Sequence, residues 1–543
     1  MNRLTDFESP EARDEVRLVS AAVAASDYQR AYEIAETALD RGAVHPTFFG
    51  ARALWLERQH RDEEALADFE RAVSLAPKNA AVLNAIGLCL TRLYRLDEAV
   101  SAFDEAIACN PTYTPSYHRK GIALGMAGDF AAARRAHEQA VKLNPRDMEA
   151  LASLATIAAR KGETKKALDY AQRALKLDPR QATAIAAQAL VANSEGRFVE
   201  AEQLTRPLLG RSDLAAAARA VVLGLLADAL DGQERVAEAF EAYSEENQGL
   251  LRLHAPRFSG LRSVTDFTRD LVAHFQAVPP EPRLADSDPT PRRHVFLLGF
   301  YRSGTTLLGQ VLASHPDIVT LEERDFLLVQ AANYLSDASG LARLATLTDD
   351  EAAEERNAYW RQIADGGLAL EGKVLVDKQP LNTIKLPLIA RLFPNAKIVF
   401  AVRDPRDVVL SCFRRQFEIN AAMFDLLTLE GVAAFYDAVM QLAAVMQRPL
   451  DQPFFTHRYE DTIKDFDGRI AALCDYLGVP FSPAMREFYA TARAQDIRSP
   501  SANQVTRELY SEGVGQWRRY RDQLAPILAM LAPWIAEFGY PPE

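Results

Sequence analysis

A 34-residue period in the first half of the chain restricts its fold more than any other feature. Prolines recur at this spacing, and three series of small residues stay in phase with them. Small residues let the two helices of a hairpin approach closely, and a proline ends the second helix. The period therefore predicts stacked helical hairpins. The positions in register are Pro77, Pro111, Pro145 and Pro179; Ala31, Ala65, Ala99, Ala133, Ala167 and Ala201; Ala38, Ala72, Ala106, Ala140 and Ala174; and Ala53, Gly87, Gly121, Ala155 and Ala189.

This pattern resembles the tetratricopeptide repeat family, whose unit is a helix–turn–helix of about 34 residues. About six units run from near residue 12 to residue 213, and residues 214–247 resemble a degenerate last unit. We expect an all-α solenoid over residues 12–250. Its concave surface would bind a peptide or another protein, with a structural or dimerisation role as the alternative. Tyr113, Tyr117 and His118 are candidates for that groove or, alternatively, for the core between repeats.

Proline-rich sequence separates the repeats from the second half. Pro279-Pro280-Glu281-Pro282 begins a stretch that continues to Pro291 and breaks the helical periodicity. We expect a connecting helix and linker over residues 251–291 and a second domain over 292–543. There, apolar runs alternate with helical stretches, which indicates an α/β domain with a mainly parallel sheet. The expected strands are Val295–Leu298, Val374–Val376, Lys397–Val402 and Phe454–Thr456.

A glycine-bounded loop follows the first expected strand. The sequence Gly299-Phe-Tyr-Arg-Ser-Gly-Thr-Thr306 joins an apolar strand to an apolar helical pattern, which is the layout of a phosphate-cradling loop at a helix N-terminus. Thr305 stands where nucleotide-triphosphatase loops carry the lysine that reaches the β- and γ-phosphates. The loop therefore suits a smaller anion such as a 5′-phosphosulfate. A glycine turn in some other α/β domain is the alternative.

A second candidate anion site follows the third expected strand. Arg403 comes directly after that strand, and Asp404 with Pro405 favours the start of a helix. Ser411 lies about two turns along that helix. An arginine and a hydroxyl form a suitable pair for a phosphate. The alternative is an Arg403–Asp407 ion pair at a solvated helix start.

Short motifs continue through the second half of the chain: Arg302-Ser-Gly-Thr-Thr-Leu307, His315-Pro316, Glu322-Glu323, Asp377-Lys378-x-Pro380, Arg391-Leu-Phe-Pro-Asn395, Val402-Arg-Asp404, Tyr459-Glu460, Ser501-x-x-Gln504-Val505 and Trp517. They resemble the sulfotransferase family, whose members use 3′-phosphoadenosine 5′-phosphosulfate (PAPS), and within it the tyrosylprotein sulfotransferases. The likeness covers about residues 293–540, and bacterial proteins that join tetratricopeptide repeats to such a domain resemble the whole chain. It implies an all-α tetratricopeptide-repeat solenoid followed by an α/β P-loop-like sulfotransferase domain with a mainly parallel sheet.

The resemblance implies a donor site made from the loop and the second anion site. Arg403 and Ser411 correspond to the residues that hold the donor's 3′-phosphate. Arg415 corresponds to a further donor-binding arginine, and Tyr459 to a tyrosine of the same pocket. The residues that correspond to the family's 5′-phosphosulfate loop are Arg302, Ser303, Gly304, Thr305 and Thr306.

The resemblance also implies four catalytic residues. Glu323 corresponds to the general base that takes the proton of the acceptor hydroxyl; an acidic residue at a helix start is the alternative. Lys378 corresponds to the lysine that neutralises charge on the leaving group, with an exposed surface lysine as the alternative. Ser501 corresponds to a serine that stabilises the transferring sulfuryl group, which we also expect Arg302 to contact. His315 precedes a proline at a helix end and is expected to be structural.

Two departures from the family are visible. The family carries a lysine just before the matched tryptophan, as part of its 3′-phosphate grip, whereas this chain has Gln516. Arg518 or Arg519 is a candidate to compensate for it. Relatives of the secretory pathway carry cysteines where this chain has Leu321 and Val376. That difference agrees with a cytoplasmic protein without disulfides.

Charge and cysteine content limit the function further. The net charge of −12 argues against nonspecific binding to nucleic acid or acidic membranes. The four cysteines have neither metal-ligand spacing nor a disulfide framework, so no metal is expected. We expect no leader at Met1 and no apolar run long enough to span a bilayer. A reducing, cytoplasmic location fits these features best.

The function indicated is PAPS-dependent transfer of a sulfuryl group to an acceptor hydroxyl, with a protein tyrosine delivered by the solenoid as one candidate acceptor. A carbohydrate or small-molecule sulfotransferase is an alternative. A repeat scaffold with impaired catalysis is another, and Gln516 is the feature that favours it. A kinase or other triphosphatase is disfavoured by Thr305 in the place of lysine. The oligomeric state is left open.

Overall fold

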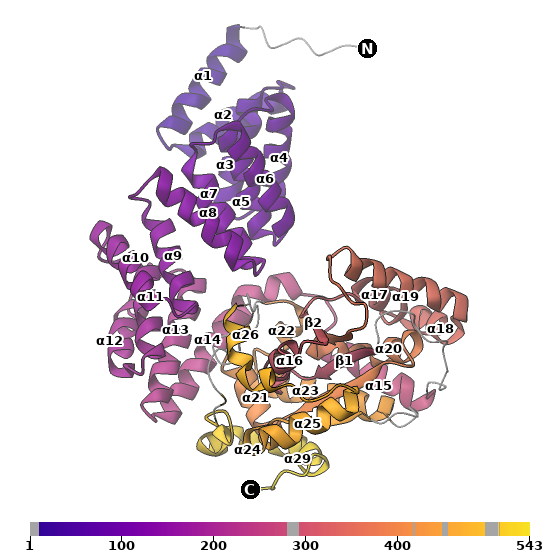
Figure 1. Ribbon diagram of the computed structural model, residues 1–543. Coiled ribbons are helices and arrows are strands. Elements are labelled where there is room, and N and C mark those ends of the chain that lie inside the picture. The colour runs from indigo at the N-terminus through magenta and orange to yellow at the C-terminus, as the bar shows by residue number, and fades with distance from the viewer. Residues whose placement is uncertain are drawn as a thin grey trace. The chain divides into compact units, whose positions relative to one another are not determined.

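The computed structural model describes residues 10–279, 293–415, 417, 419–447, 454–494, 509 and 511–543. They divide into two compact units, Met1–Ser194 and Glu195–Glu543. In the first unit every regular element described is a helix, and consecutive helices pack as antiparallel pairs (Figure 1). The predicted all-α solenoid is confirmed. Its helices are α1 (Pro10–Ala24), α2 (Tyr28–Asp40), α3 (Pro46–Arg58), α4 (Asp62–Leu75), α5 (Ala80–Arg92), α6 (Leu96–Cys109), α7 (Thr114–Met126), α8 (Phe130–Leu143), α9 (Met148–Arg160), α10 (Thr164–Leu177) and α11 (Ala182–Ser194).

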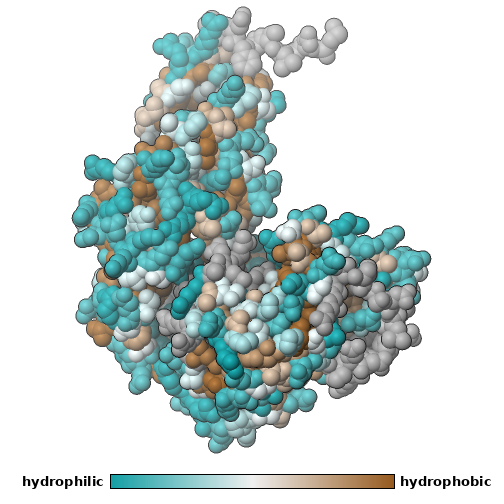
Figure 2. Space-filling view, in the orientation of Figure 1, coloured by the Kyte–Doolittle hydropathy of each residue, from teal (hydrophilic) through white to brown (hydrophobic). Residues whose placement is uncertain are grey.

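The small residues of the period lie where the two helices of a pair cross. A Cβ atom on Gly87 would lie 2.5 Å from Cε1 of Phe103, and one on Gly121 would lie 2.5 Å from Cε1 of His137. The close approach that the period predicts is therefore present in these pairs, because larger side chains would displace the rings. Hydrophilic residues predominate on the face of the repeats shown in Figure 2, since much of the apolar surface lies between the helices.

The three groove candidates of the fourth helical pair make local contacts. The hydroxyl of Tyr117 donates to the carbonyl of Pro111 at 3.1 Å. The ring of His118 lies 5.1 Å from that of His137, so it contributes to the packing between helices α7 and α8. Tyr113 is the N-cap residue of α7. A groove function for these residues remains a prediction.

Substitution of His137 tests the packing of the repeats. His137 occupies the position that Phe69 and Phe103 hold in the two preceding repeats, and burial lowers its pKa to about 3. An unfolded histidine has a pKa of about 6.5, so the unfolded state takes up a proton first as the pH falls. The free energy of unfolding that this group contributes is complete above about pH 6.5 and is lost towards pH 3. His137→Phe should reduce that loss, measured by denaturant unfolding at several pH values.

The exposed His60 provides the control for this measurement. His60→Asn keeps a residue that tolerates the positive φ of 58° at this position, and it should leave the pH dependence as in the parent chain. Equal pH dependence in the parent and the His137→Phe variant would contradict the assignment of His137 as a buried neutral ring.

The second unit is built around a five-stranded sheet in which every strand pairing is parallel. Its order is β2–β3–β1–β4–β5. Gly299 of β1 pairs with Ala401 of β4, and Leu297 with Lys378 of β3, so the three central strands end at nearly the same level. The predicted parallel α/β fold is confirmed. The strands are β1 (Arg293–Gly299), β2 (Ile318–Glu322), β3 (Val374–Lys378), β4 (Lys397–Val402) and β5 (Phe455–Arg458).

Strand β2 was not among the strands expected from the sequence. Its β-branched run Ile318-Val319-Thr320 is the signal that could have indicated it. The run is only three residues long and begins shortly after the helix that ends at Ala313, so periodicity alone could not separate it from a turn.

Helices cover the sheet, and α12–α15 cluster with it although the repeat pattern assigns them to the solenoid and the connecting segment. The helices before the sheet are α12 (Phe198–Leu209), α13 (Ala216–Gly232), α14 (Val236–Phe258) and α15 (Val264–Ala277). The helices that come between the strands along the chain are α16 (Thr305–Ala313), α17 (Leu328–Tyr334), α18 (Ala338–Thr346), α19 (Asp349–Ala364), η1 (Pro380–Lys385), α20 (Leu386–Leu392), α21 (Pro405–Phe413), α22 (Ala421–Asp425) and α23 (Leu429–Gln447). After β5 come α24 (Tyr459–Lys464), α25 (Phe466–Leu477), η2 (Pro483–Glu487), α26 (Phe488–Ala494), η3 (Gln516–Tyr520), α28 (Arg521–Leu524), η4 (Ala525–Ile527) and α29 (Leu528–Glu537).

Helix α23 corrects one expectation from the sequence. This 19-residue helix contains an 18-residue stretch with a mean hydropathy of 1.3, so by length and composition alone it could cross a membrane. However, 67% of this stretch is buried in the structure, and the helix packs against α15, α21 and α29. Val432, Phe435 and Val439 lie in the main hydrophobic core. A helix in the core of a protein can be equally long and apolar, and α23 occupies a core position.

Candidate functional site

Each of the five strands delivers a predicted site residue just beyond its carboxyl end. Because all the strands run parallel, these ends meet at one edge of the sheet, where ligands collect in such folds. Strand β1 leads into the glycine-bounded loop. The residues that follow the other strands are Glu323 after β2, Lys378 at the end of β3, Arg403 after β4 and Tyr459 after β5.

The loop after β1 turns sharply before α16 begins. Arg302 has a φ of 65° and Gly304 a φ of 95°, so the chain twice enters the left-handed region before Thr305 starts the helix. The hydroxyl of Ser303 is buried and donates to the carbonyl of Phe300 at 2.7 Å. This conformation leaves the loop at the N-terminus of α16, whose first backbone N–H groups lack partners within the helix.

Thr383 of η1 fixes the start of the loop. Its hydroxyl accepts from the backbone N–H of Gly299 at 3.1 Å and donates to the Gly299 carbonyl at 2.7 Å. Gly299 itself has no room for a side chain, because a Cβ atom would lie 2.6 Å from the carbonyl oxygen of Ala401. No local pattern in the sequence indicates this role for Thr383.

Arg403 links the loop to the C-terminal segment. It is 8% exposed, and its guanidinium donates to the carbonyl of Arg302 at 3.2 Å and to the carbonyl of Gly513. Its Nε is buried without a partner among the described residues. Asp407 does not pair with it. That carboxylate accepts instead from the backbone N–H groups of Gly515 at 2.7 Å and Trp517 at 2.8 Å. The ion pair considered as the alternative from the sequence is therefore absent between these two described residues.

The two predicted anion sites are joined by a direct hydrogen bond. Nε of Arg302 in the loop donates to Oγ of Ser411 on α21 at 2.9 Å. Arg415, two residues beyond α21, pairs with Asp228 of α13 at 3.5 Å between Nη1 and Oδ2. The structure thus brings Arg302 and Ser411 together, while Arg415 is turned towards a helix that precedes the sheet.

Tyr459 covers the loop from the β5 side. A Cβ atom on Gly304 would lie 2.9 Å from Cδ2 of Tyr459, and the guanidinium carbon of Arg403 lies 5.3 Å from the centre of the Tyr459 ring. A small hollow lined by the loop, the first turns of α16 and the end of β5 lies beside this ring. Gly304 is therefore required both for its backbone conformation and for the aromatic contact.

Glu323 and Lys378 form an ion pair at the edge of the sheet. Nζ of Lys378 donates to Oε1 of Glu323 at 2.8 Å, and the backbone N–H of Glu323 donates to the carbonyl of Lys378 at 3.1 Å. The Lys378 side chain is completely buried, whereas that of Glu323 is 28% exposed. The aliphatic stem of Lys378 packs on Gly309 of α16. A Cβ atom added to Gly309 would lie 3.3 Å from Cε of Lys378. Lys378 is therefore not the surface lysine that the sequence left open.

Backbone and charge mark Glu323 as an unusual position. Its φ of 25° is positive, which L-residues adopt rarely and at a cost. Burial raises the pKa of Tyr301 in the loop, and the nearby Glu323 carboxylate raises it further. The carboxylate of Glu323 therefore lies close enough to the loop to act on its side chains electrostatically.

Asp377, which precedes Lys378, points to the opposite face of the sheet. Its carboxylate accepts from the hydroxyl of Tyr359 at 2.9 Å, and that hydroxyl is 3.0 Å from Nε2 of His294. Burial raises the pKa of Asp377 to about 7. This group lies in the packing under α19 and supports β3 from behind.

The remaining sequence predictions concern Ser501, His315 and Gln516. Ser501 lies outside the described residues, as do Gln504 and Val505. His315 is 2% exposed; its Nδ1 accepts from the N–H of Asp317 at 3.0 Å and its Nε2 lies 2.7 Å from the carbonyl of Pro480, contacts that suit a structural residue.

Gln516 and its candidate replacements lie in the turn η3. Nε2 of Gln516 donates to the carbonyl of Glu512 at 2.6 Å. Arg519 donates to Asp231 of α13, and Arg518 is exposed beside the Trp517 ring at 5.1 Å. Arg519 is therefore engaged away from the 3′-phosphate residues.

The fold and this edge define a class of protein: a parallel α/β domain in which a glycine-bounded loop without the triphosphatase lysine joins the first strand to a helix. Residues 294–483 match the sulfotransferase family, and residues 16–80, 58–114 and 118–182 match the tetratricopeptide repeat. Tetratricopeptide repeats in the first part of the chain are thus followed by a domain that matches the sulfotransferase family.

Relatives give the same picture at low identity. An uncharacterised protein of Aquifex aeolicus is 28% identical over 312 residues, which cover 55% of this chain and 38% of that protein. Protein-tyrosine sulfotransferase 1 of Danio rerio is 25% identical over 263 residues, or 46% of this chain and 72% of that one. The chain thus spans well under half of the Aquifex protein. Together these findings support a sulfotransferase.

Among solved structures, a tetratricopeptide repeat protein from Parabacteroides merdae is similar over 44% of this chain and 92% of its own. The two are 15% identical, with a TM-score of 0.36.

Within the described part of the chain, no cluster of three or more His, Cys, Asp or Glu side chains is arranged to hold a metal ion.

Gly304→Ala should damage the anion site more than the fold. An alanine at a φ of 95° costs about 1–2 kcal/mol and would also meet the ring of Tyr459. We expect the affinity for 3′-phosphoadenosine 5′-phosphate (PAP) to fall at least about tenfold, measured by titration calorimetry. Gly162→Ala is the matched control, because Gly162 has a φ of 71° with open space around it. Unchanged PAP affinity in the Gly304→Ala variant would exclude the loop as the binding site.

Proposed function

We propose that this chain is a PAPS-dependent sulfotransferase that transfers a sulfuryl group to an acceptor hydroxyl. The observation that carries the proposal is the meeting of the Glu323–Lys378 ion pair with a lysine-less anion loop at one sheet edge. The carboxylate of Glu323 is partly exposed, and the ammonium of Lys378 that pairs with it is buried. This is the arrangement needed to take a proton from an acceptor and to neutralise charge on a leaving group.

The residues present fit a nucleotide that carries a 5′-phosphosulfate and a 3′-phosphate. The N-terminus of α16 and the hydroxyls of Thr305 and Thr306 would receive the 5′ group. Ser411 with Arg403 would hold the 3′-phosphate. Nε of Arg403, which is buried and has no partner among the described residues, is a donor that suits an anion. Without the triphosphatase lysine, the loop has no group to hold a γ-phosphate.

The donor, when bound, supplies an activated sulfuryl group. Glu323 would accept the proton of the acceptor hydroxyl as the new oxygen–sulfur bond forms. Lys378 would donate to the oxygen that bridges sulfur and the 5′-phosphate as that bond breaks, so the negative charge left on PAP is stabilised as it develops. Glu323 must release Lys378 for this, and the partial exposure of the Glu323 side chain makes it accessible to an acceptor.

The acceptor is proposed from the relatives and the repeats. Several relatives are named protein-tyrosine sulfotransferases, which supports a tyrosine side chain as the acceptor. Tetratricopeptide repeats commonly bind polypeptides, so the solenoid is proposed to deliver the acceptor chain. The four cysteines, all free thiols in the structure, suit a reducing compartment, and we propose a cytoplasmic location.

Mass spectrometry of products tests the proposed reaction. The full-length chain is incubated with PAPS and a panel of tyrosine peptides, glycans and small phenols. We expect a mass increase of one sulfuryl group on a tyrosine peptide. Sulfation of a glycan or a small phenol alone would retain the reaction class and replace the acceptor. No product from a folded chain that binds PAP would contradict the catalytic proposal and favour a scaffold.

Lys378→Ala should lower the transfer rate about 100-fold or more, because removal of one donor to a developing oxyanion typically has this effect. Glu323→Gln should lower it comparably while preserving the shape of the site. Lys373→Ala is the matched control, since Lys373 precedes β3 and is 35% exposed, and this variant should transfer at the parent rate. Rates measured at saturating PAPS distinguish the outcomes; near-parent rates for both site variants would exclude these two residues as the catalytic pair.

A further inference from the structure

Asp231, near the C-terminal end of α13, is the centre of a polar cluster that reaches the donor site. Its carboxylate accepts from the guanidinium of Arg414 and from the hydroxyl of Tyr520 at 2.7 Å. Arg519 donates to both the carboxylate at 2.5 Å and the backbone carbonyl at 2.9 Å of the same residue. Asp231 and Arg414 are each only 12% exposed at the side chain. One carboxylate therefore ties together three donors from two segments that flank the donor site.

Those segments are the end of α21 and the turn η3. Arg414 follows α21 directly, three residues after Ser411. Trp517 in η3 is tied in turn to α21, because its backbone N–H donates to Asp407. A change at Asp231 would therefore be transmitted to both sides of the predicted 3′-phosphate site.

Neighbouring contacts from α13 and α14 strengthen the same junction. Nδ2 of Asn247 donates to the carbonyl of Phe413, the last residue of α21, at 2.9 Å. The ring of Phe240 lies 5.2 Å from that of Phe413. Asp228, one turn before Asp231, accepts from Tyr243 at 2.6 Å and pairs with Arg415. The α13–α14 hairpin thus caps the end of α21 with polar and aromatic contacts together.

We propose that Asp231 is a positioning residue of the donor site, and that the α13–α14 hairpin is part of the transferase although it lies in repeat register. This inference rests on the proposed function. Asp231 holds Arg414 and η3 so that Ser411, three residues before Arg414, is preformed to receive the 3′-phosphate. It touches neither donor nor acceptor itself.

The expected consequence is a selective loss of donor affinity. A partly buried guanidinium deprived of its carboxylate reorients towards water or another acceptor, and the segment that carries it loses its fixed position. Asp231→Asn keeps the shape and removes the charge. In the full-length chain we expect the Kd for PAP to rise about tenfold. The KM for PAPS should rise in parallel, while kcat at saturating PAPS stays near the parent value, because Glu323 and Lys378 are untouched.

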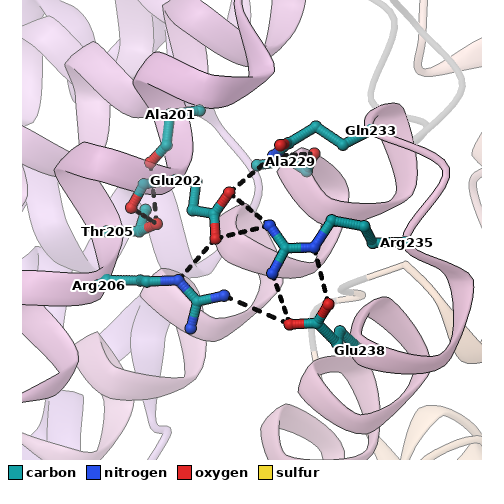
Figure 3. A network of polar contacts seen from close by, with 8 residues as sticks. All are labelled: Ala201, Glu202, Thr205, Arg206, Ala229, Gln233, Arg235 and Glu238. Carbon is teal, nitrogen blue, oxygen red and sulfur yellow. Dashed lines mark hydrogen bonds and ion pairs between the residues drawn. The ribbon is translucent and has the colours of Figure 1, made fainter.

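Figure 3 shows the matched control, a polar cluster around Glu202 of α12. Glu202 of α12 accepts from Arg206, from Gln233 and from Arg235, which also pairs with Glu238. Burial opposes its ionisation, but these hydrogen bonds prevail and lower the pKa of Glu202 to about 2. Glu202→Gln therefore breaks a comparable polar cluster whose bonds are to α12 and to the turn between α13 and α14. It should reduce thermal stability and leave the Kd for PAP unchanged.

Tyr520→Phe provides a milder test if Asp231→Asn does not fold, which circular dichroism would reveal. It removes one hydrogen bond to Asp231 and keeps all charges, and the Kd should rise about two- to threefold. Asp231→Glu should recover part of the lost affinity.

Four outcomes separate the proposals. Weaker PAP binding in the Asp231 and Tyr520 variants but not in Glu202→Gln supports the inference. Parent-like affinity in both folded variants overturns it and leaves the proposed function standing. Equal loss in Glu202→Gln overturns it as well, since the effect would then be general destabilisation. Failure of the parent chain to bind PAP overturns the proposed function and this inference together.

Discussion

The parallel direction of all five strands is the constraint on which the site depends. Parallel pairing puts every strand's carboxyl end at one edge, so residues that are up to about 150 positions apart in the chain meet there. The order β2–β3–β1–β4–β5 then decides who neighbours whom. Strand β3 lies beside β2, which pairs Lys378 with Glu323. Strand β4 lies beside β1, which sets Arg403 against the loop.

The loop itself is held in a costly conformation by its surroundings. Three residues contact the loop from the segments that follow three different strands: Thr383, Arg403 and Tyr459. Together these contacts offset the free-energy cost of the positive φ of Arg302. A loop fixed in this way presents its backbone donors without reordering when an anion arrives, which favours binding. The same rigidity explains why the α13–α14 hairpin matters, because it fixes the end of α21 that carries the second half of the site.

Much of this could be predicted from the sequence, since the strongest signals were local. The 34-residue period specified the helical pairs, and the pattern around Gly299 specified a strand, a glycine-bounded loop and a helix in that order. Strand β2 was missed because Ile318–Thr320 is short, and Thr383 because its role depends on a contact with Gly299 across the fold. Asp231 was not found because the repeat register suggested a solenoid residue. Its partners Arg414 and Tyr520 are 183 and 289 positions away along the chain. Contacts at such distances follow from the topology and leave no periodic trace.

Calorimetric titration of the full-length chain with PAP and with ATP, each with and without Mg²⁺, tests the central claim most directly. A site built for a 5′-phosphosulfate and a 3′-phosphate should bind PAP with one-to-one stoichiometry whether or not Mg²⁺ is present. It should bind Mg²⁺–ATP far more weakly, because Thr305 replaces the lysine that a γ-phosphate requires. Metal-dependent binding of ATP in preference to PAP would contradict the assignment of this sheet edge as a sulfotransferase donor site.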